Sequence, residues 1–100
     1  MYAIALAVGV EEDLAELRAF DRTTVLNAIE EQLSHQPGVP TKRRKVLVGL
    51  IPPWHAVPPV WQLSVGDVRV FYDVDEEKKK MVAVRAVRRK PPHATTEEIL

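Results

Sequence analysis

The sequence has no cysteine, only four glycines in 100 residues, and no long hydrophobic run. Without cysteine the chain forms neither a disulfide framework nor a thiolate site, so a reducing compartment such as the cytoplasm is permitted. The glycines lie far apart, which excludes a glycine-rich loop of the kind that cradles phosphate. The longest uncharged apolar stretch, residues 1–10, is about half as long as the roughly 20 residues of a membrane-spanning helix. We therefore expect no membrane span, and no secretory signal because neither a positively charged segment nor a cleavage site flanks this stretch.

Signals for metal binding and nucleophilic catalysis are also missing. His35 and His55 have no cysteine, histidine or acidic companions at metal-ligand spacing, so both are expected to be ordinary exposed residues. Ser34 and Ser64 lie in no nucleophile elbow, which argues against a Ser/His/acid triad. The sequence therefore predicts no metal and no other cofactor.

Charge is distributed unevenly along the chain, although the formal net charge is zero. Residues 1–40 carry seven acidic and two basic residues, a net −5, whereas residues 41–100 carry twelve basic and seven acidic residues, a net +5. Such an asymmetry fits a surface suited to an anionic partner, and it equally fits two solvated faces of opposite sign. Charge alone leaves both interpretations open.

Hydrophobic spacing predicts one strand and two helices at the start of the chain. Residues 2–8 are an apolar run bounded by glycine and are expected to form a buried strand. Residues 11–20 predict a helix, because Leu14, Leu17 and Phe20 recur at every third position behind three acidic residues. A second helix, capped by Thr23 or Thr24, is expected to end before the Pro-Gly pair at residues 37–38.

The middle of the chain is predicted to be irregular. Residues 41–45 form a cationic run, and residues 46–50 are compatible with a short strand. Residues 51–59 contain four prolines, which exclude regular structure. A long loop in a small domain is often functional, so this segment is a candidate binding element.

The last third of the chain has the strongest pattern. Residues 60–65 and 68–74 are strand-like runs joined by the turn pair Gly66-Asp67, and residues 81–89 are a third run rich in valine. Three such strands with short turns predict an antiparallel meander. Residues 95–98 are expected to begin a final helical turn.

Period-two alternation along these three strands assigns the two faces of the sheet. One face is apolar and is predicted to be the core beneath the two helices: Trp61, Leu63, Val65, Val68, Val70, Tyr72, Val74, Val82, Val84 and Ala86. The opposite face is mixed and includes three arginines. Its residues are Gln62, Ser64, Arg69, Phe71, Asp73, Arg85, Val87 and Arg89. We therefore predict a single α+β domain over residues 1–100, in which the N-terminal strand and a two-helix hairpin pack on one face of a small antiparallel sheet. Its other face would be a basic ligand surface.

The hairpin sequence WQLSVGDVRVFYDVD at residues 61–75, with its Gly-x-x-Arg-Val-x-Tyr motif, resembles the RelE/ParE superfamily of toxins from type II toxin–antitoxin systems. The order of strand, two helices, basic loop and valine-rich strand extends the resemblance over residues 2–90. It implies a cytoplasmic toxin held inactive in a hetero-oligomer by a cognate antitoxin. RelE-like members cut messenger RNA on the ribosome without metal, and ParE-like members poison DNA gyrase. Both branches share the hairpin arginine.

Metal-free RNA cleavage requires proton removal from a 2′-hydroxyl, stabilisation of the phosphorane and protonation of the leaving oxygen. By its place in the motif, Arg69 would stabilise the phosphorane, because a guanidinium grips phosphate oxygens bidentately. Arg88 or Arg89 resembles the second basic position of the family, and alternation favours Arg89, which is expected to share a face with Arg69. A cluster of cations favours loss of a proton from one lysine, so Lys42 or Lys45 is a candidate base.

The remaining basic residues of the loop and last strand are expected to contact RNA: Lys42, Arg43, Arg44, Arg85 and Arg88. Many ribonuclease members carry a tyrosine or histidine in the tail after the last strand, but no tyrosine follows Tyr72 here. His93 is the remaining candidate acid, because histidine titrates near neutrality. Trp61 is expected in the core, whereas Trp54 would either stack on a base or antitoxin segment or anchor its loop. The missing tyrosine favours the gyrase-poisoning alternative, and an inactive binding module is a third interpretation.

Overall fold

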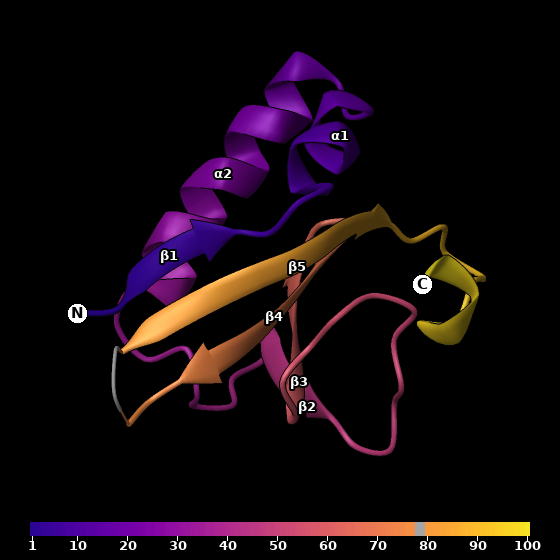
Figure 1. The fold of residues 1–100 in the computed structure, drawn as a ribbon. Coiled ribbons are helices and arrows are strands. Elements are labelled where there is room, and N and C mark those ends of the chain that lie inside the picture. The colour runs from indigo at the N-terminus through magenta and orange to yellow at the C-terminus, as the bar shows by residue number, and fades with distance from the viewer. Residues whose placement is uncertain (78–79) are drawn as a thin grey trace.

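The computed structural model describes residues 1–77 and 80–100. Its elements follow in the order β1 (Ala3–Leu6), α1 (Val10–Ala15), α2 (Ala19–Leu33), β2 (Arg44–Leu47), β3 (Val60–Val65), β4 (Val68–Asp75), β5 (Met81–Arg89) and the 3₁₀ turn η1 (Glu97–Ile99). The strands form one five-stranded sheet in the order β1-β5-β4-β3-β2 (Figure 1). β1 runs parallel to β5, and every other pair is antiparallel. No helix of the described residues is long and apolar enough to cross a membrane.

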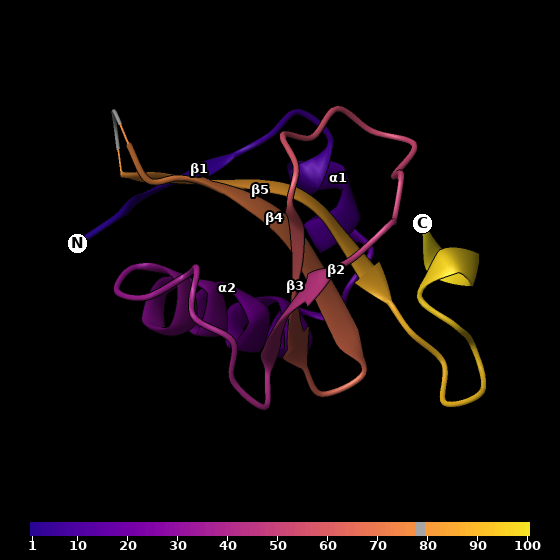
Figure 2. The same cartoon turned by 90° about the horizontal axis from the view of Figure 1, so that it is seen from below.

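Both helices lie on one face of the sheet, and the hydrophobic core lies between this helical layer and the sheet. Figure 2 shows α2 on one side of the curved sheet and the loop between β2 and β3 on the other. The apolar stripe of α2, Val25, Ile29 and Leu33, is at most 3% exposed. Beneath the helices lie five side chains with 0% exposure: Leu63, Val70, Tyr72, Val82 and Val84. The predicted α+β class and the helical layer on one sheet face are confirmed.

The first helix is shorter than predicted. α1 ends at Ala15, and Phe20, expected on its apolar stripe, is 80% exposed in the first turn of α2. The Arg22 side chain holds the turn between the helices, because its guanidinium donates to the carbonyls of Leu14 (2.9 Å) and Leu17 (3.0 Å). Carbonyls at a helix C-terminus lack helical partners, so Arg22 adds a hydrogen-bond donor where α1 ends and the chain turns into α2.

The start of the second helix was also predicted wrongly. α2 begins at Ala19, four residues before the expected cap at Thr23 or Thr24. Both threonines lie inside the helix, where their hydroxyls donate to the carbonyls four residues earlier, at 3.1 and 3.0 Å. A threonine hydroxyl can make either bond, so residue type alone does not separate a cap from an interior position.

The first strand is an edge strand and is mostly exposed, whereas the sequence predicted a buried strand. β1 pairs only with β5, and only Ile4 of its four residues packs against the core. An apolar run of this length indicates a strand but does not report how many neighbours the strand has.

The predicted hairpin and meander are confirmed, with one irregularity. Gly66 turns the chain between β3 and β4 with a φ of 60°, which glycine adopts without strain. In β5 a bulge breaks the alternation: Phe71 pairs with Ala86 but the next residue, Tyr72, pairs with Val84. Ala86 therefore lies opposite Phe71, away from the helices, and Val87 lies in the core at 3% exposure. Both placements reverse the prediction, because one extra residue inverts the faces of every later position.

Candidate functional site

Three arginines stand in one row on the open face, which is the face of the sheet turned away from α1 and α2. Ser64 pairs with Arg69, and Arg69 pairs with Arg88. Arg43 continues the row beyond β3, because the backbone N–H of Ser64 donates to its carbonyl oxygen at 2.8 Å. We call Arg43, Arg69 and Arg88 the arginine row. With neighbouring strands about 4.8 Å apart, the row spans about 14 Å.

Arg69 is bound only to its own hairpin. Its Nη1 donates to the carbonyls of Gly66 (2.7 Å) and Val68 (3.0 Å), and it has no carboxylate partner in the described part of the chain. The Nε and Nη2 groups, which together form one edge of the guanidinium fork, have no partner among those residues. This edge can accept two oxygens of a phosphate or carboxylate.

Arg85 shows what that edge does when it is occupied. Its Nε and Nη2 donate to the two carboxylate oxygens of Asp73, at 2.8 and 3.2 Å. Asp73 is only 5% exposed and also accepts the backbone N–H of Val57 at 3.0 Å. The pair fastens the proline-rich loop to the sheet. Arg85, expected to contact RNA, therefore has its binding edge engaged within the protein.

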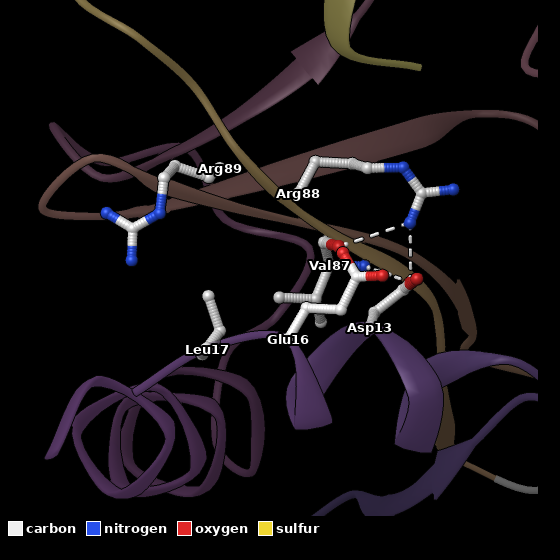
Figure 3. Close-up of a pocket in the computed structure, with 6 residues that line it drawn as sticks. All are labelled: Asp13, Glu16, Leu17, Val87, Arg88 and Arg89. Carbon is white, nitrogen blue, oxygen red and sulfur yellow. Dashed lines mark hydrogen bonds and ion pairs between the residues drawn. The ribbon is translucent and has the colours of Figure 1, made fainter. Parts of the chain in front are cut away.

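Arg88 is held from two sides. Its Nη1 contacts Asp13 Oδ2 at 2.6 Å and donates to the carbonyl of Val87 at 3.1 Å, and its guanidinium lies 5.3 Å from the centre of the Trp54 ring. Figure 3 shows Arg88 reaching from β5 over Asp13 of α1. As in Arg69, the Nε and Nη2 edge has no partner among residues 1–77 and 80–100.

Arg89 lies on the helix-covered side, so the prediction that it shares a face with Arg69 is wrong. It pairs in register with Val68, which belongs to the core. Its guanidinium contacts Asp21 of α2 at 3.1 Å and also bonds to Asp67. The hydrogen bond to Asp21 and the charge of Asp67 raise the pKa of Arg89 above its ordinary value. The bulge in β5 produces this exchange of places between Arg88 and Arg89.

Arg44, expected in a solvated loop, is buried instead. It is 8% exposed at the start of β2 and donates to the carbonyl of Gln32 near the C-terminus of α2. A cation at that helix end is stabilised by the helix dipole. Its charge also acts on Tyr72, whose pKa is raised by burial and lowered in part by Arg44. The structure thus keeps Arg44 away from any ligand on the open face.

The other predicted residues are exposed. Lys45 pairs with Gln62, so it stands in the row next to the arginine row. Lys42 lies before β2, and His93 lies in the tail between β5 and η1. The side chains of Lys42 and His93 make no hydrogen bond or ion pair with a described residue. The structure brings Lys45 near the arginine row and shows no contact that joins His93 to it.

The centre of the open face is covered, although the sequence predicted a fully open ligand surface. Trp54, from the loop between β2 and β3, packs against Phe71 with ring centres 5.3 Å apart. The Thr96 hydroxyl of the C-terminal tail donates to Gln62 at 3.3 Å. Phe71 and Gln62 are consequently 0% and 2% exposed. Trp54 therefore anchors its loop, one of the two roles the sequence left open.

Comparison with solved structures identifies the architecture. The chain is similar to RelE in the RelBE2 toxin–antitoxin complex of Mycobacterium tuberculosis, with a TM-score of 0.71 and 19% identity over 89% of this chain and 98% of that chain. It is also similar to RelE in the archaeal RelE–RelB complex of Pyrococcus horikoshii OT3, with a TM-score of 0.69 and 20% identity over 93% of this chain and 98% of that one. The chain has a RelE-like fold. No family model matches the sequence, and no curated protein matches it.

Within this RelE-like fold, sequence reasoning missed the acidic partners of the arginines. Asp13 and Asp21 lie on the helices and Asp67 lies in the hairpin turn, and each binds an arginine of β5. Asp13 is 75 positions from Arg88 in the sequence, so no local spacing signals the contact. The only available signal was the acidic excess of the first 40 residues opposite the basic last strand.

A mixed-charge cleft separates α1 from the end of β5 in the RelE-like fold. It has a volume of about 430 Å³ and is lined by Asp13, Glu16, Leu17, Val87, Arg88 and Arg89. Figure 3 shows the two arginines leaving β5 in opposite directions. The cleft therefore lies between the ion pairs of the two arginines, and the arginine row itself lies on the adjoining open face.

Proposed function

We propose that this protein is the toxin of a toxin–antitoxin pair, that it cleaves messenger RNA on the ribosome in the cytoplasm, and that a cognate antitoxin neutralises it. The arginine row carries this proposal. It is supported by the RelE-like fold, whose two reported neighbours come from toxin–antitoxin complexes.

Arg69 has the central role in the proposed reaction. A 2′-hydroxyl loses its proton and bonds to the adjacent phosphorus, negative charge develops on the phosphorane oxygens, and the bond to the 5′-oxygen then breaks as that oxygen takes up a proton. The unoccupied Nε and Nη2 edge of Arg69 would bind two of these oxygens, because the hydrogen bonds to Gly66 and Val68 use only Nη1. Those bonds also fix the direction of the guanidinium, so little reorganisation is needed when the phosphate binds.

Arg88 replaces Arg89 as the second cation of the proposed site. Arg88 is the register neighbour of Arg69, whereas the donors of Arg89 are engaged by two aspartates on the other side of the sheet. Arg43 would bind a flanking phosphate at the other end of the row. Lys45, in the neighbouring row, would act as base.

Two exposed residues complete the proposed site, and the remaining cations are left out of it. His93 would act as acid if the tail moves towards the arginine row on binding, and Lys42 would add a phosphate contact from the segment before β2. Arg44 is not included because it is buried, with its Nη1 bonded to the carbonyl of Gln32. Arg85 is not included because the carboxylate of Asp73 binds its Nε and Nη2.

The antitoxin would contribute a helix or strand that covers the arginine row. Binding of an acidic segment there neutralises cations that RNA would otherwise contact, so the two ligands would exclude one another. The affinity for such a segment should fall as salt is added, because exposed charges are screened.

The test is cleavage of ribosome-bound messages by the purified protein, mapped by primer extension. Arg69→Ala should abolish cleavage and leave the melting temperature unchanged. Arg18→Ala, which removes an exposed cation at the N-terminus of α2, should cleave normally. Unchanged cleavage by Arg69→Ala would refute the proposed site.

Two other outcomes would select a different function. Inhibition of gyrase supercoiling with intact transcripts would identify a gyrase inhibitor, the alternative that the missing tail tyrosine favours. Normal growth after expression without antitoxin would identify a binding module with no toxicity.

A further inference from the structure

Asp13 and Trp54 approach Arg88 from two elements that are distant in the sequence. The Asp13 carboxylate of α1 accepts both the Arg88 guanidinium (2.6 Å) and the Val87 backbone N–H (3.0 Å) through the same oxygen. The indole of Trp54, from the loop on the open face, lies 5.3 Å from the guanidinium of Arg88. The ion pair is half-buried, with side-chain exposures of 22% for Asp13 and 32% for Arg88.

These contacts restrict a side chain that is otherwise flexible. An arginine on a strand end samples many rotamers, and an ion pair together with a cation–π contact removes most of them. Both interactions leave the Nε and Nη2 edge of Arg88 without a partner among the described residues, because Asp13 and the Val87 carbonyl bind Nη1. The same edge is unoccupied in Arg69. In both arginines Nη1 is therefore bonded within the protein, and the Nε and Nη2 edge is left to bind a ligand.

We propose that Asp13 and Trp54 are positioning residues that hold Arg88 in line with Arg69. They act through Arg88, do not touch RNA, and set the maximal rate of cleavage more than the affinity for the message. This role rests on the proposed function, since it requires that Arg88 binds a phosphate of the reacting strand. A displacement of about 1 Å in a positioned catalytic group costs up to about 100-fold in rate.

The cleft in Figure 3 supplies a matched pair of variants. Asp13 of α1 and Glu16, the residue that follows α1, line the same cleft, but only Asp13 is bonded to Arg88. Asp13→Asn removes the charge and keeps an oxygen that can accept the Val87 N–H, whereas Glu16→Gln removes the same charge from a side chain with no partner in the described ranges. Asp13→Asn should lower the maximal rate by about 10- to 100-fold with little change in the half-saturating message concentration. Glu16→Gln should leave both unchanged.

A double-mutant cycle tests whether Asp13 acts through Arg88. In an Arg88→Ala background, Asp13→Asn should have no further effect on the maximal rate, because the group that it positions is already absent. An equal loss in both backgrounds would overturn the positioning role and indicate a general effect on folding.

Substitution of Trp54 gives an independent route to the same role. Trp54→Phe keeps an aromatic face for Arg88 and should keep most of the activity, whereas Trp54→Leu should lower the maximal rate by about tenfold. Equal activity of the two variants, or of Asp13→Asn and Glu16→Gln, would overturn the proposal. These comparisons of maximal rates require a wild-type protein that cleaves messages. A wild-type protein that leaves messages intact overturns the proposed function, and the positioning role with it.

Discussion

The two faces of the sheet are both buried at their centres, but they are buried in different ways. On the helix-covered face, Leu63, Val70 and Val84 are wholly apolar and pack against α1 and α2. On the open face, Gln62 and Asp73 are nearly as buried, at 2% and 5% exposure, yet each has a polar partner in the loop or tail. The helix-covered face is therefore stabilised by area and packing density, and the open face by individual partners. Variants of the helix-covered face should therefore lose stability through cavities, and variants of the open face through polar groups left without a partner.

The largest effect is expected on the helix-covered face. Leu63→Ala removes a side chain with 0% exposure and leaves a cavity that the surrounding strands cannot fill. The free energy of unfolding should fall by about 2–5 kcal/mol, measured by urea denaturation. Leu6→Ala, at a position that is 44% exposed on the edge strand β1, is the matched control and should cost far less. Equal losses at the two positions would contradict the packing described for this face.

On the open face the largest loss should follow from removing a partner. Asp73→Ala leaves the Arg85 guanidinium and the Val57 N–H without their acceptor, and should lower the free energy of unfolding by about 3 kcal/mol in urea denaturation. The control is Asp67→Ala, which breaks an ion pair whose aspartate side chain is 54% exposed and should barely change the urea midpoint. A melting curve of Asp73→Ala that superimposes on that of the control would show that the loop is fastened by other contacts.

Activity should separate the two arginines at the end of β5. Arg88→Ala removes a cation of the arginine row and should lower the cleavage rate by about 100-fold, the usual cost of losing one group that stabilises transition-state charge. Arg89→Ala removes a cation from the helix-covered side and should leave the rate unchanged. Cleavage of ribosome-bound messages by the two variants is the measurement. Loss of cleavage in Arg89→Ala, with normal cleavage in Arg88→Ala, would place the functional cation on the helix-covered side of the sheet.

The smallest effect at neutral pH is expected for Tyr72, whose hydroxyl donates to the carbonyl of Pro37 at 2.7 Å. Tyr72→Phe should cost about 1 kcal/mol through loss of this hydrogen bond. Burial raises the pKa of Tyr72 in the folded protein above its ordinary value, so the unfolded chain loses this proton first as pH rises. The stabilisation is therefore complete below about pH 10 and declines above it by about 1.4 kcal/mol per pH unit. Urea midpoints from pH 8 to 11 should converge for the two proteins, and parallel curves would contradict the assignment.

Much of the fold follows from local patterns. The hairpin was predictable because the Gly66 turn and the alternation on both sides of it agree, and Arg69 was placed correctly because it lies within three residues of that turn. The helix boundary was not, because Thr23 can cap a helix or bond inside one with equal ease. The exposure of β1 was not predictable either, since a strand carries no local record of its neighbours.

The sequence alone encodes the element order, the meander and the side of the hairpin on which Arg69 stands, because each depends on contacts within a few residues. Tertiary structure decides which arginine of β5 accompanies Arg69 and which acid holds it. A single extra residue in a bulge exchanges the faces of Arg88 and Arg89, and packing of α1 against β5 brings Asp13 to Arg88 across most of the chain. Side-chain partners that are far apart in sequence are selected by how elements pack, and that selection leaves no periodic signal to read.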